Sequence, residues 1–479
     1  MNNKNCIVPV ILSLLSLPVI ASDLKPNDGL YNDNILKLEA SSFADAQGSY
    51  SVEQCPKKTP NNKSILKGSP TALQETLWKI ALDDMERNII PHEKGAYFGA
   101  GTRYGTRIYT RDISFAGILG ANDLYPQVML TSLKITRELR MRMGFQVSAP
   151  HVVEEIKAPW QVIAETEKEV MAKYNSNCIT RNTDDVIWVW AMHDLYTKNP
   201  KLAEWKWFYD TGKKFFDLNY APWYDKSDGL YRGQAVFQDI THNGYPDGMS
   251  IQDCVLLKSS STNALYYKAL LCMADAARQA GESETAVRQW KEKAESLQLA
   301  FQKEFLMPDG RLSYYKDRYG RLMPNQHNLS TGLAALFKIL TPEQAKKAYS
   351  LYPVTDRGVS LIHPYLADKL GSHNSASWPF CCTIFLWGKE ITNGESQLDL
   401  NTALLARSLG TKLEERKVNK NKPVDPNNPE DADWDDGFGS FHEKIDHVTG
   451  VIGGSGHQLW SAAAYLNMFL RQDMVEIQP

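Results

Sequence analysis

The sequence predicts an all-α protein whose helices form one compact toroid over residues 71–479. Apolar residues recur at helical spacing in about a dozen segments, whereas the alternating pattern typical of strands is scarce. Short connections alternate with long ones between these segments, which favours helices that pair into hairpins around a ring. We expect helices at 71–89, 112–120, 124–143, 184–198, 201–217, 262–280, 284–305, 327–339, 342–350, 376–389, 397–409 and 457–472.

The chain begins with a segment that has the pattern of a secretory signal peptide. Lys4 precedes an apolar run from Cys6 to Ile20, and Val19 and Ala21 are the small residues of a cleavage site after Ala21. The run is shorter than the ~20 residues that span a bilayer comfortably. An uncleaved anchor is the alternative. We expect export, to the periplasm or outside the cell, and a polar N-terminal arm over residues 22–70.

The composition is that of a globular protein with a large core. Apolar residues make up 43% of the chain, and the net charge of −3 gives no sign of nucleic-acid binding. No second long apolar run follows the first, so we expect no membrane span after cleavage. There is no CxxC, HExxH, GxGxxG or P-loop pattern, and we expect neither a metal centre nor a cofactor.

The segment YTRDISFAGIL places Arg111 and Asp112 together at the start of an expected helix. A helix N-terminus favours an acidic residue, so a capping acid beside an ion-pair partner is one interpretation. The other is that the forked guanidinium and the carboxylate bind neighbouring hydroxyls of a sugar. These residues alone leave both interpretations open.

The same YTRD segment, followed by an apolar helix, resembles the TRD segment of glucoamylases. Similar Arg-Asp segments occur in related (α/α)6-barrel glycosidases. In glucoamylases this pair binds the non-reducing sugar in the subsite where the bond is cut. The resemblance therefore implies a six-hairpin (α/α)6 toroid, with Arg111 and Asp112 as substrate-binding residues.

The segment TDDVIWVWAMHDLY reads first as a well-capped core helix. Thr183 is a suitable cap, Asp184 and Asp185 fill the first turn, and Trp188 begins the apolar face. Related barrels often place an acid and an aromatic residue from this position in the pocket. The resemblance thus adds Asp185 and Trp188 as binding candidates.

The segment DGLYRGQAVFQD, followed by SSSTNALYYKAL, resembles the glucosidase domain of glycogen debranching enzymes. There a DGL segment leads to the catalytic general acid and then to a helix that contains NALWY. The resemblance implies that Asp239 is the acid and that Asn263 and Tyr267 lie on the helix behind it. The spacing differs from the family's, so Asp247 and Asp253 compete with Asp239, and each is also a suitable turn or cap acid.

The segment HNSASWPFCCTIFLW resembles the H-x-G-x-x-W-P segment of the same enzymes, in which a Trp lines the pocket. The resemblance implies this role for Trp378, with His373 as a second candidate. Cys381 and Cys382 fall inside an expected helix, and we interpret them as buried thiols. His363 is interpreted as a loop histidine with satisfied hydrogen bonds.

The segment from Phe441 to Tyr465 resembles the E-x-x-D-x-x-T-G and W-S/T-A segments near the C-terminus of glucoamylases and glycoside hydrolase family 63. The resemblance makes Glu443 the general base and places Trp460 among the pocket residues. The alternative is a surface acid beside an acidic loop. The acids of that loop, without EF-hand spacing, are also suitable calcium ligands: Asp431, Asp433, Asp435 and Asp436.

The resemblance implies an exo-acting, inverting glycoside hydrolase on oligosaccharides, with an α-glucosidase as the first choice. Asp239 would protonate the leaving oxygen, and Glu443 would activate a water on the opposite face of the sugar. Rhamnosides, mannosides and trehalose are alternative substrates. A non-catalytic carbohydrate-binding toroid and a polysaccharide lyase are alternatives from other classes, and the lack of a basic cluster near these segments argues against the lyase.

Overall fold

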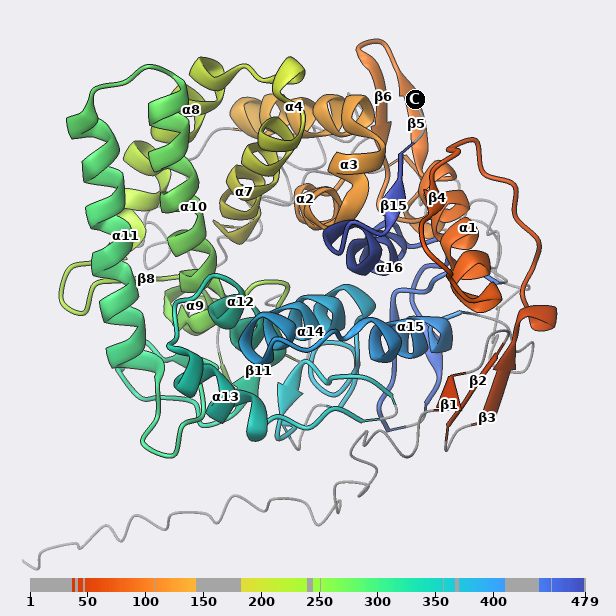
Figure 1. Ribbon diagram of the computed structural model, residues 1–479. Helices are drawn as coiled ribbons and strands as arrows, with labels where there is room; N and C mark the ends of the chain where they lie inside the picture. Colours follow the sequence, from red (N-terminus) through yellow and green to blue (C-terminus); the bar gives the residue numbers. More distant parts are fainter. Residues whose placement is uncertain are drawn as a thin grey trace, which may run out of the picture.

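Twelve helices form two concentric rings in the part of the chain that the computed structural model describes (Figure 1). This part comprises residues 37–38, 42–45, 48–106, 108–143, 182–238, 244–249, 251–355, 357–366, 370–409, 439–448 and 450–477. The inner ring consists of α2 (Thr110–Ala116), α7 (Asn182–Lys198), α10 (Ser260–Gln279), α12 (Asn328–Leu336), α14 (Pro379–Asn393) and α16 (Leu459–Arg471). The outer ring consists of α1 (Ala72–Glu86), α4 (Pro126–Met143), α8 (Trp205–Phe215), α11 (Glu284–Phe305), α13 (Pro342–Ser350) and α15 (Leu398–Arg407).

The inner ring is closed by contacts between successive helices. Helix α2 packs against α7, and the ring continues through α10, α12, α14 and α16 back to α2. Outer and inner helices alternate along the chain, so each outer helix pairs with an inner helix in a hairpin (Figure 1). This is the (α/α)6 toroid that the sequence predicts.

The extent of side-chain burial differs between helices of the inner ring and helices of the outer ring. Every residue of α2 is buried, as are all residues of α16 from Leu459 to Phe469. The outer helix α11 buries one face only, and its buried residues recur every three or four positions. These are Val287, Trp290, Ala294, Leu297, Phe301 and Phe305. The core is therefore continuous between the rings.

Some helix ends follow local signals. Helix α1 begins with a capping box between Thr71 and Gln74, and α14 ends at Gly394, which has a φ of 74°. The helix expected at 112–120 ends as an α-helix at Ala116 and continues as a π-turn, Gly117–Ala121. Gly120 adopts a φ of 150°, which interrupts regular helix geometry.

The remaining elements are short. Helices α3 (Asn122–Leu124) and α9 (Ile251–Leu256) lie in connections, and the strands form small antiparallel sheets. The pairs are β5 (Ile89–His92) with β6 (Gly95–Phe98), β7 (Tyr224–Asp225) with β8 (Leu230–Tyr231), β9 (Lys258–Ser259) with β10 (Tyr315–Lys316), β11 (Gln326–His327) with β12 (Ile362–His363), and β13 (Lys444–Ile445) with β14 (Ile452–Gly453). The loops therefore contain local pairings that periodicity did not predict.

The arm before α1 contributes strands of its own. Strands β1 (Lys37–Leu38), β2 (Ser42–Asp45) and β3 (Gly48–Ser51) form one sheet, and β4 (Ile65–Leu66) pairs with β15 (Val475–Glu476) near the C-terminus. The expected signal peptide, residues 1–21, and the acidic loop with Asp431 lie outside the described residues. Within the described residues, no helix has the length and apolar character needed to cross a bilayer.

Candidate active site

The inner helices all begin at one end of the ring. Connections from an outer helix to the next inner helix are long, whereas the returns are short, so the inner helices run parallel. The long connections are 87–109, 144–181, 216–259, 306–327, 351–378 and 408–458. Helix N-termini carry partial positive charge. Six helix N-termini lie at this end of the ring, and their partial positive charges favour carboxylates there.

Glu443 lies at this end, immediately before β13, and is 8% exposed. The Tyr104 hydroxyl donates a 2.8 Å hydrogen bond to its Oε1, and the Ser455 N–H donates a 3.1 Å hydrogen bond to Oε2. The Glu443 N–H donates in turn to the Ser455 carbonyl at 3.1 Å. Burial raises the pKa of Glu443, while Lys444, Tyr104 and Ser455 oppose that rise. The carboxylate is thus held on both oxygens.

Gly454 is required for this arrangement. Its φ is 84°, in the left-handed region that favours glycine. A Cβ at this position would overlap Oε2 and Cβ of Glu443. Backbone and side chain therefore meet here only because the residue beside Ser455 has no side chain.

Asp112, in the first turn of α2, shares this environment. Burial raises its pKa to about 7; Arg111 opposes the rise, and Glu443 and Asp184 add to it. Gln458, directly before α16, approaches Asp112 Oδ1 with Nε2 at 3.5 Å. The structure therefore brings together Arg111, Asp112 and Glu443.

An aromatic cluster adjoins these charged groups. The Phe237 ring lies 4.3 Å from Trp378, 5.3 Å from Trp460 and 5.0 Å from His373, measured between ring centroids. The Arg111 guanidinium lies 5.4 Å from the centre of the Phe237 ring. Phe237 has a φ of 71°, which is rare for an aromatic residue, so the backbone is strained where the ring enters the cluster.

Two buried polar atoms beside the cluster have no hydrogen-bond partner among the described residues: Trp460 Nε1 and Gln458 Oε1. Buried polar atoms in folded proteins are usually paired, and an unpaired one is explained by strain, a bound water molecule or ion, or a functional role. One is a donor and the other an acceptor. Together they are suited to the hydroxyl groups of a sugar.

Sequence reasoning missed three residues of this site: Tyr104, Gln458 and Lys444. The Lys444 ammonium hydrogen-bonds to Ser372 and lies 5.6 Å from the Trp378 ring centre. Lys444 and Gln458 adjoin recognised motifs, which is the only signal that the sequence offers for them. Tyr104 is 339 residues from Glu443, and no local pattern links the two.

Asp185 and Trp188 lie in a different environment. Asp185 forms a 2.7 Å ion pair with Arg137, and both side chains are almost fully buried. The Arg137 guanidinium lies 4.7 Å from the Trp188 ring centre and 4.6 Å from that of Phe215. Their contacts are those of a core helix, the first interpretation of this segment. The charge of the neighbouring Asp184 contributes, with that of Glu443, to the raised pKa of Asp112.

Asn263 and Tyr267 of α10 also make structural contacts. The Asn263 side chain accepts from the Tyr231 N–H at 2.8 Å and donates to the Tyr231 and Ser259 carbonyls at 3.0 and 2.8 Å. Burial raises the pKa of Tyr267, and Glu295 of α11 adds to the rise, so the hydroxyl lies toward the outer ring. Neither residue is placed beside Glu443 by these contacts.

The general acid expected from the sequence, Asp239, lies outside the described residues. Its two competitors are described. Asp247 is exposed in a turn, and Asp253 at the start of α9 forms a 3.4 Å ion pair with Arg318. Cys381 and Cys382 are buried free thiols in α14, which confirms the interpretation from sequence.

No protein-family model matches the sequence. No curated protein matches it either. Solved structures do match. A family 78 rhamnosidase from Bacillus sp. GL1 superposes with a TM-score of 0.54 at 13% identity, covering 90% of this chain and 37% of its own. The chain thus spans little more than a third of the rhamnosidase.

Two further structures match over nearly their whole length. A family 63 mannosylglycerate hydrolase from Thermus thermophilus has a TM-score of 0.52 at 12% identity, with 82% of this chain and 99% of the hydrolase covered. A glycosidase variant in complex with glucose has a TM-score of 0.52 at 12% identity, with 84% and 98% covered. At these identities the likeness establishes the fold: the chain has the six-hairpin glycosidase fold.

Proposed function

We propose that this protein is an exo-acting glycoside hydrolase that cleaves oligosaccharides with inversion, with Glu443 as the general base. One observation carries the proposal: a buried carboxylate is held on both oxygens at the N-terminal end of the inner ring, beside Arg111 and Asp112. The structural neighbours, a rhamnosidase and a mannosylglycerate hydrolase among them, support hydrolysis of glycosidic bonds.

In this mechanism Glu443 takes a proton from a water molecule as the water oxygen attacks the anomeric carbon. A carboxylic acid on the other side gives its proton to the glycosidic oxygen, and the bond to the leaving group breaks. Asp239 is our choice for that acid, on the sequence alone. Inversion requires the two carboxyl groups to lie about 6.5–9.5 Å apart, which leaves room for the water.

Substrate binding is assigned to the groups around the base. The Asp112 carboxylate and the Arg111 guanidinium are suited to neighbouring hydroxyls of the sugar that loses the bond. Trp460 Nε1 and Gln458 Oε1 supply one further donor and one acceptor. The Phe237, Trp378 and Trp460 rings provide apolar surface for the sugar ring. Glucose is the preferred sugar, and the expected signal peptide implies action outside the cytoplasm.

The test is turnover of a panel of aryl glycosides and disaccharides by wild type, Glu443→Gln and the control Glu395→Gln. Glu395 is an exposed acid between α14 and α15, where inner helices end. Glu443→Gln should lose turnover by roughly a thousandfold while it still binds sugar, and Glu395→Gln should match wild type. Full turnover by Glu443→Gln would contradict the assignment. A wild type that binds sugar without turnover would indicate a carbohydrate-binding protein.

A further inference from the structure

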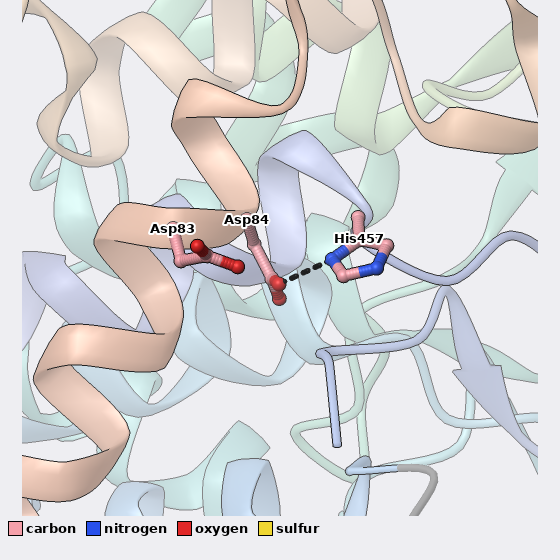
Figure 2. Close-up of side chains that lie close together, drawn as sticks. All are labelled: Asp83, Asp84 and His457. Carbon is pink, nitrogen blue, oxygen red and sulfur yellow. Dashed lines mark hydrogen bonds and ion pairs between the residues drawn. The ribbon is translucent and has the colours of Figure 1, made fainter. Parts of the chain in front are cut away.

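A buried pair of side chains connects helix α1 to the two segments that form the site. The Asp84 Oδ1 and the His457 Nδ1 lie 2.6 Å apart, and the two side chains are 0% and 1% exposed (Figure 2). Asp84 belongs to α1 in the outer ring, whereas His457 directly precedes Gln458 and α16. The pair therefore joins two elements that are far apart in the sequence.

Asp84 contacts both segments at once. Its Oδ2 accepts a 2.7 Å hydrogen bond from the N–H of Phe441, two residues before Glu443. Its Oδ1 accepts from the ring of His457, two residues after Ser455, whose N–H binds the Glu443 carboxylate. One carboxylate thus fixes the segment that carries Glu443 and the segment that holds its side chain.

Backbone bonds make the connection rigid. The Gln458 N–H donates to the Phe441 carbonyl at 2.9 Å, and the His457 N–H donates to Ser440 Oγ at 2.9 Å. Asn88 Nδ2 lies 2.7 Å from the carbonyl oxygens of both Asp84 and His457. His457 itself has a φ of 46°, a conformation that histidine adopts infrequently and that these contacts maintain.

Asp83, Asp84 and His457 also offer three possible metal-ligand atoms within 4.8 Å of one another (Figure 2). Their present partners argue against a cation. Asp83 Oδ2 lies 2.8 Å from the Lys58 ammonium and 2.8 Å from Arg87 Nε, so two positive charges already neutralise it. Both oxygens of Asp84 are engaged as described above. The arrangement is that of a structural connection.

We infer that Asp84 and His457 are positioning residues, which hold Glu443 and Gln458 in catalytic geometry from outside the site. This inference rests on the proposed function. Asp84 and His457 act through the backbone on either side of Glu443. A hydrogen-bonded pair in a fully buried position keeps its geometry closely, because leaving either polar partner unpaired is costly.

The test uses Asp84→Asn, which keeps the shape of the side chain but replaces one carboxyl oxygen with an amide NH2 group, with Asp83→Asn as the matched neighbour. Asp84→Asn should lower kcat roughly tenfold or more and change KM by less than about threefold. It should also move the acid limb of kcat/KM to higher pH. The hydrogen bonds from Tyr104 and Ser455 lower the pKa of Glu443. If Glu443 is displaced, these bonds weaken and its pKa rises. Asp83→Asn should lower the melting temperature only.

A second pair of variants separates positioning from folding. His457→Asn keeps an N–H donor near the position of Nδ1 and tolerates the positive φ, so it should retain most activity. His457→Ala loses the donor and should behave like Asp84→Asn. If Asp84→Asn kept the wild-type kcat and the wild-type acid limb of kcat/KM, the inference would be overturned.

Hydrogen exchange tests the connection without any substrate. In Asp84→Asn, amides in both 439–448 and 450–458 should exchange faster than in Asp83→Asn, and they should do so together. Unchanged exchange in either segment would overturn the inference even in an active enzyme. If wild type hydrolyses no glycoside, the proposed function fails, but this measurement still decides whether Asp84 holds both segments.

Discussion

The Tyr104 hydroxyl donates a 2.8 Å hydrogen bond to Oε1 of Glu443, across 339 residues of sequence. Tyr104 lies in the connection between α1 and α2, and Glu443 in the connection between α15 and α16. Helices α16 and α2 are neighbours that close the inner ring. The bond therefore joins the first and last long loops of the toroid and fixes the proposed base between them.

Removing that bond should impair the base. In Tyr104→Phe the Glu443 carboxylate loses a donor that lowers its pKa, so the pKa rises. A base with a higher pKa is protonated at higher pH, so the acid limb of kcat/KM should move upward. A hydrogen bond to a charged group contributes about 1.5–3 kcal/mol, so kcat should fall roughly tenfold to a hundredfold. A pH profile identical to that of wild type would contradict this role.

Asp112 should make the protein less stable as the pH rises. Its pKa is raised from 3.8 to about 7, so the folded state binds its proton more tightly than the unfolded state. That contribution is fully present below the unfolded pKa and is lost as the pH rises through about 7. Asp112→Asn should therefore raise the melting temperature at pH 8 more than at pH 4. The stabilisation, measured as free energy of unfolding, should be larger at pH 8 by about 1–4 kcal/mol. It should also raise KM. An equal effect at both pH values would contradict the assignment.

Asp185 should matter for stability more than for binding. Asp185→Asn leaves the buried Arg137 guanidinium without its anionic partner, which typically costs about 3–5 kcal/mol. We expect a lower urea midpoint and a KM within about twofold of wild type, measured well below the melting temperature. Normal stability with a strongly raised KM would instead support the binding role that the family resemblance implies.

Gly454 should not tolerate a side chain. Gly454→Ala introduces a Cβ into the space of the Glu443 carboxylate at a backbone conformation that already favours glycine. We expect turnover to fall by roughly a hundredfold or more, because small displacements of a catalytic group are costly. Gly394→Ala is the matched control: its φ is 74°, and nothing lies within 4 Å of the added Cβ. If both variants lost turnover to a similar extent, backbone strain alone would account for the effect.

Much of the fold was predictable because its signals are local. The apolar spacing of α11 and the capping residues of α1 are read directly from the sequence, and the alternation of short and long connections indicates a ring of hairpins. The π-turn after α2 was not predictable, because Gly117 and Gly120 fit a helix pattern as well as a break. At this turn a Cβ on Gly117 would overlap Met129 of α4, and a Cβ on Gly120 would overlap Leu470 of α16.

The site was only partly predictable because it depends on which side of a helix faces the centre. Asp184 and Asp185 are neighbours with the same chemistry, but successive residues on a helix point about 100° apart. The charge of Asp184 raises the pKa of Asp112, whereas Asp185 forms an ion pair with Arg137 in the core. Tyr104 belongs to no motif, and Gln458 lies just before the recognised W-S/T-A segment; the closure of the ring brings both into the site.

The most direct test of the proposed function is proton NMR of the first sugar that the wild-type protein releases. With an α-glucoside as substrate, attack by water from the face of Glu443 predicts that β-glucose appears first and then mutarotates. An α-anomer released first would mean that the configuration is retained. That result would contradict a base that activates water and would require a covalent intermediate instead.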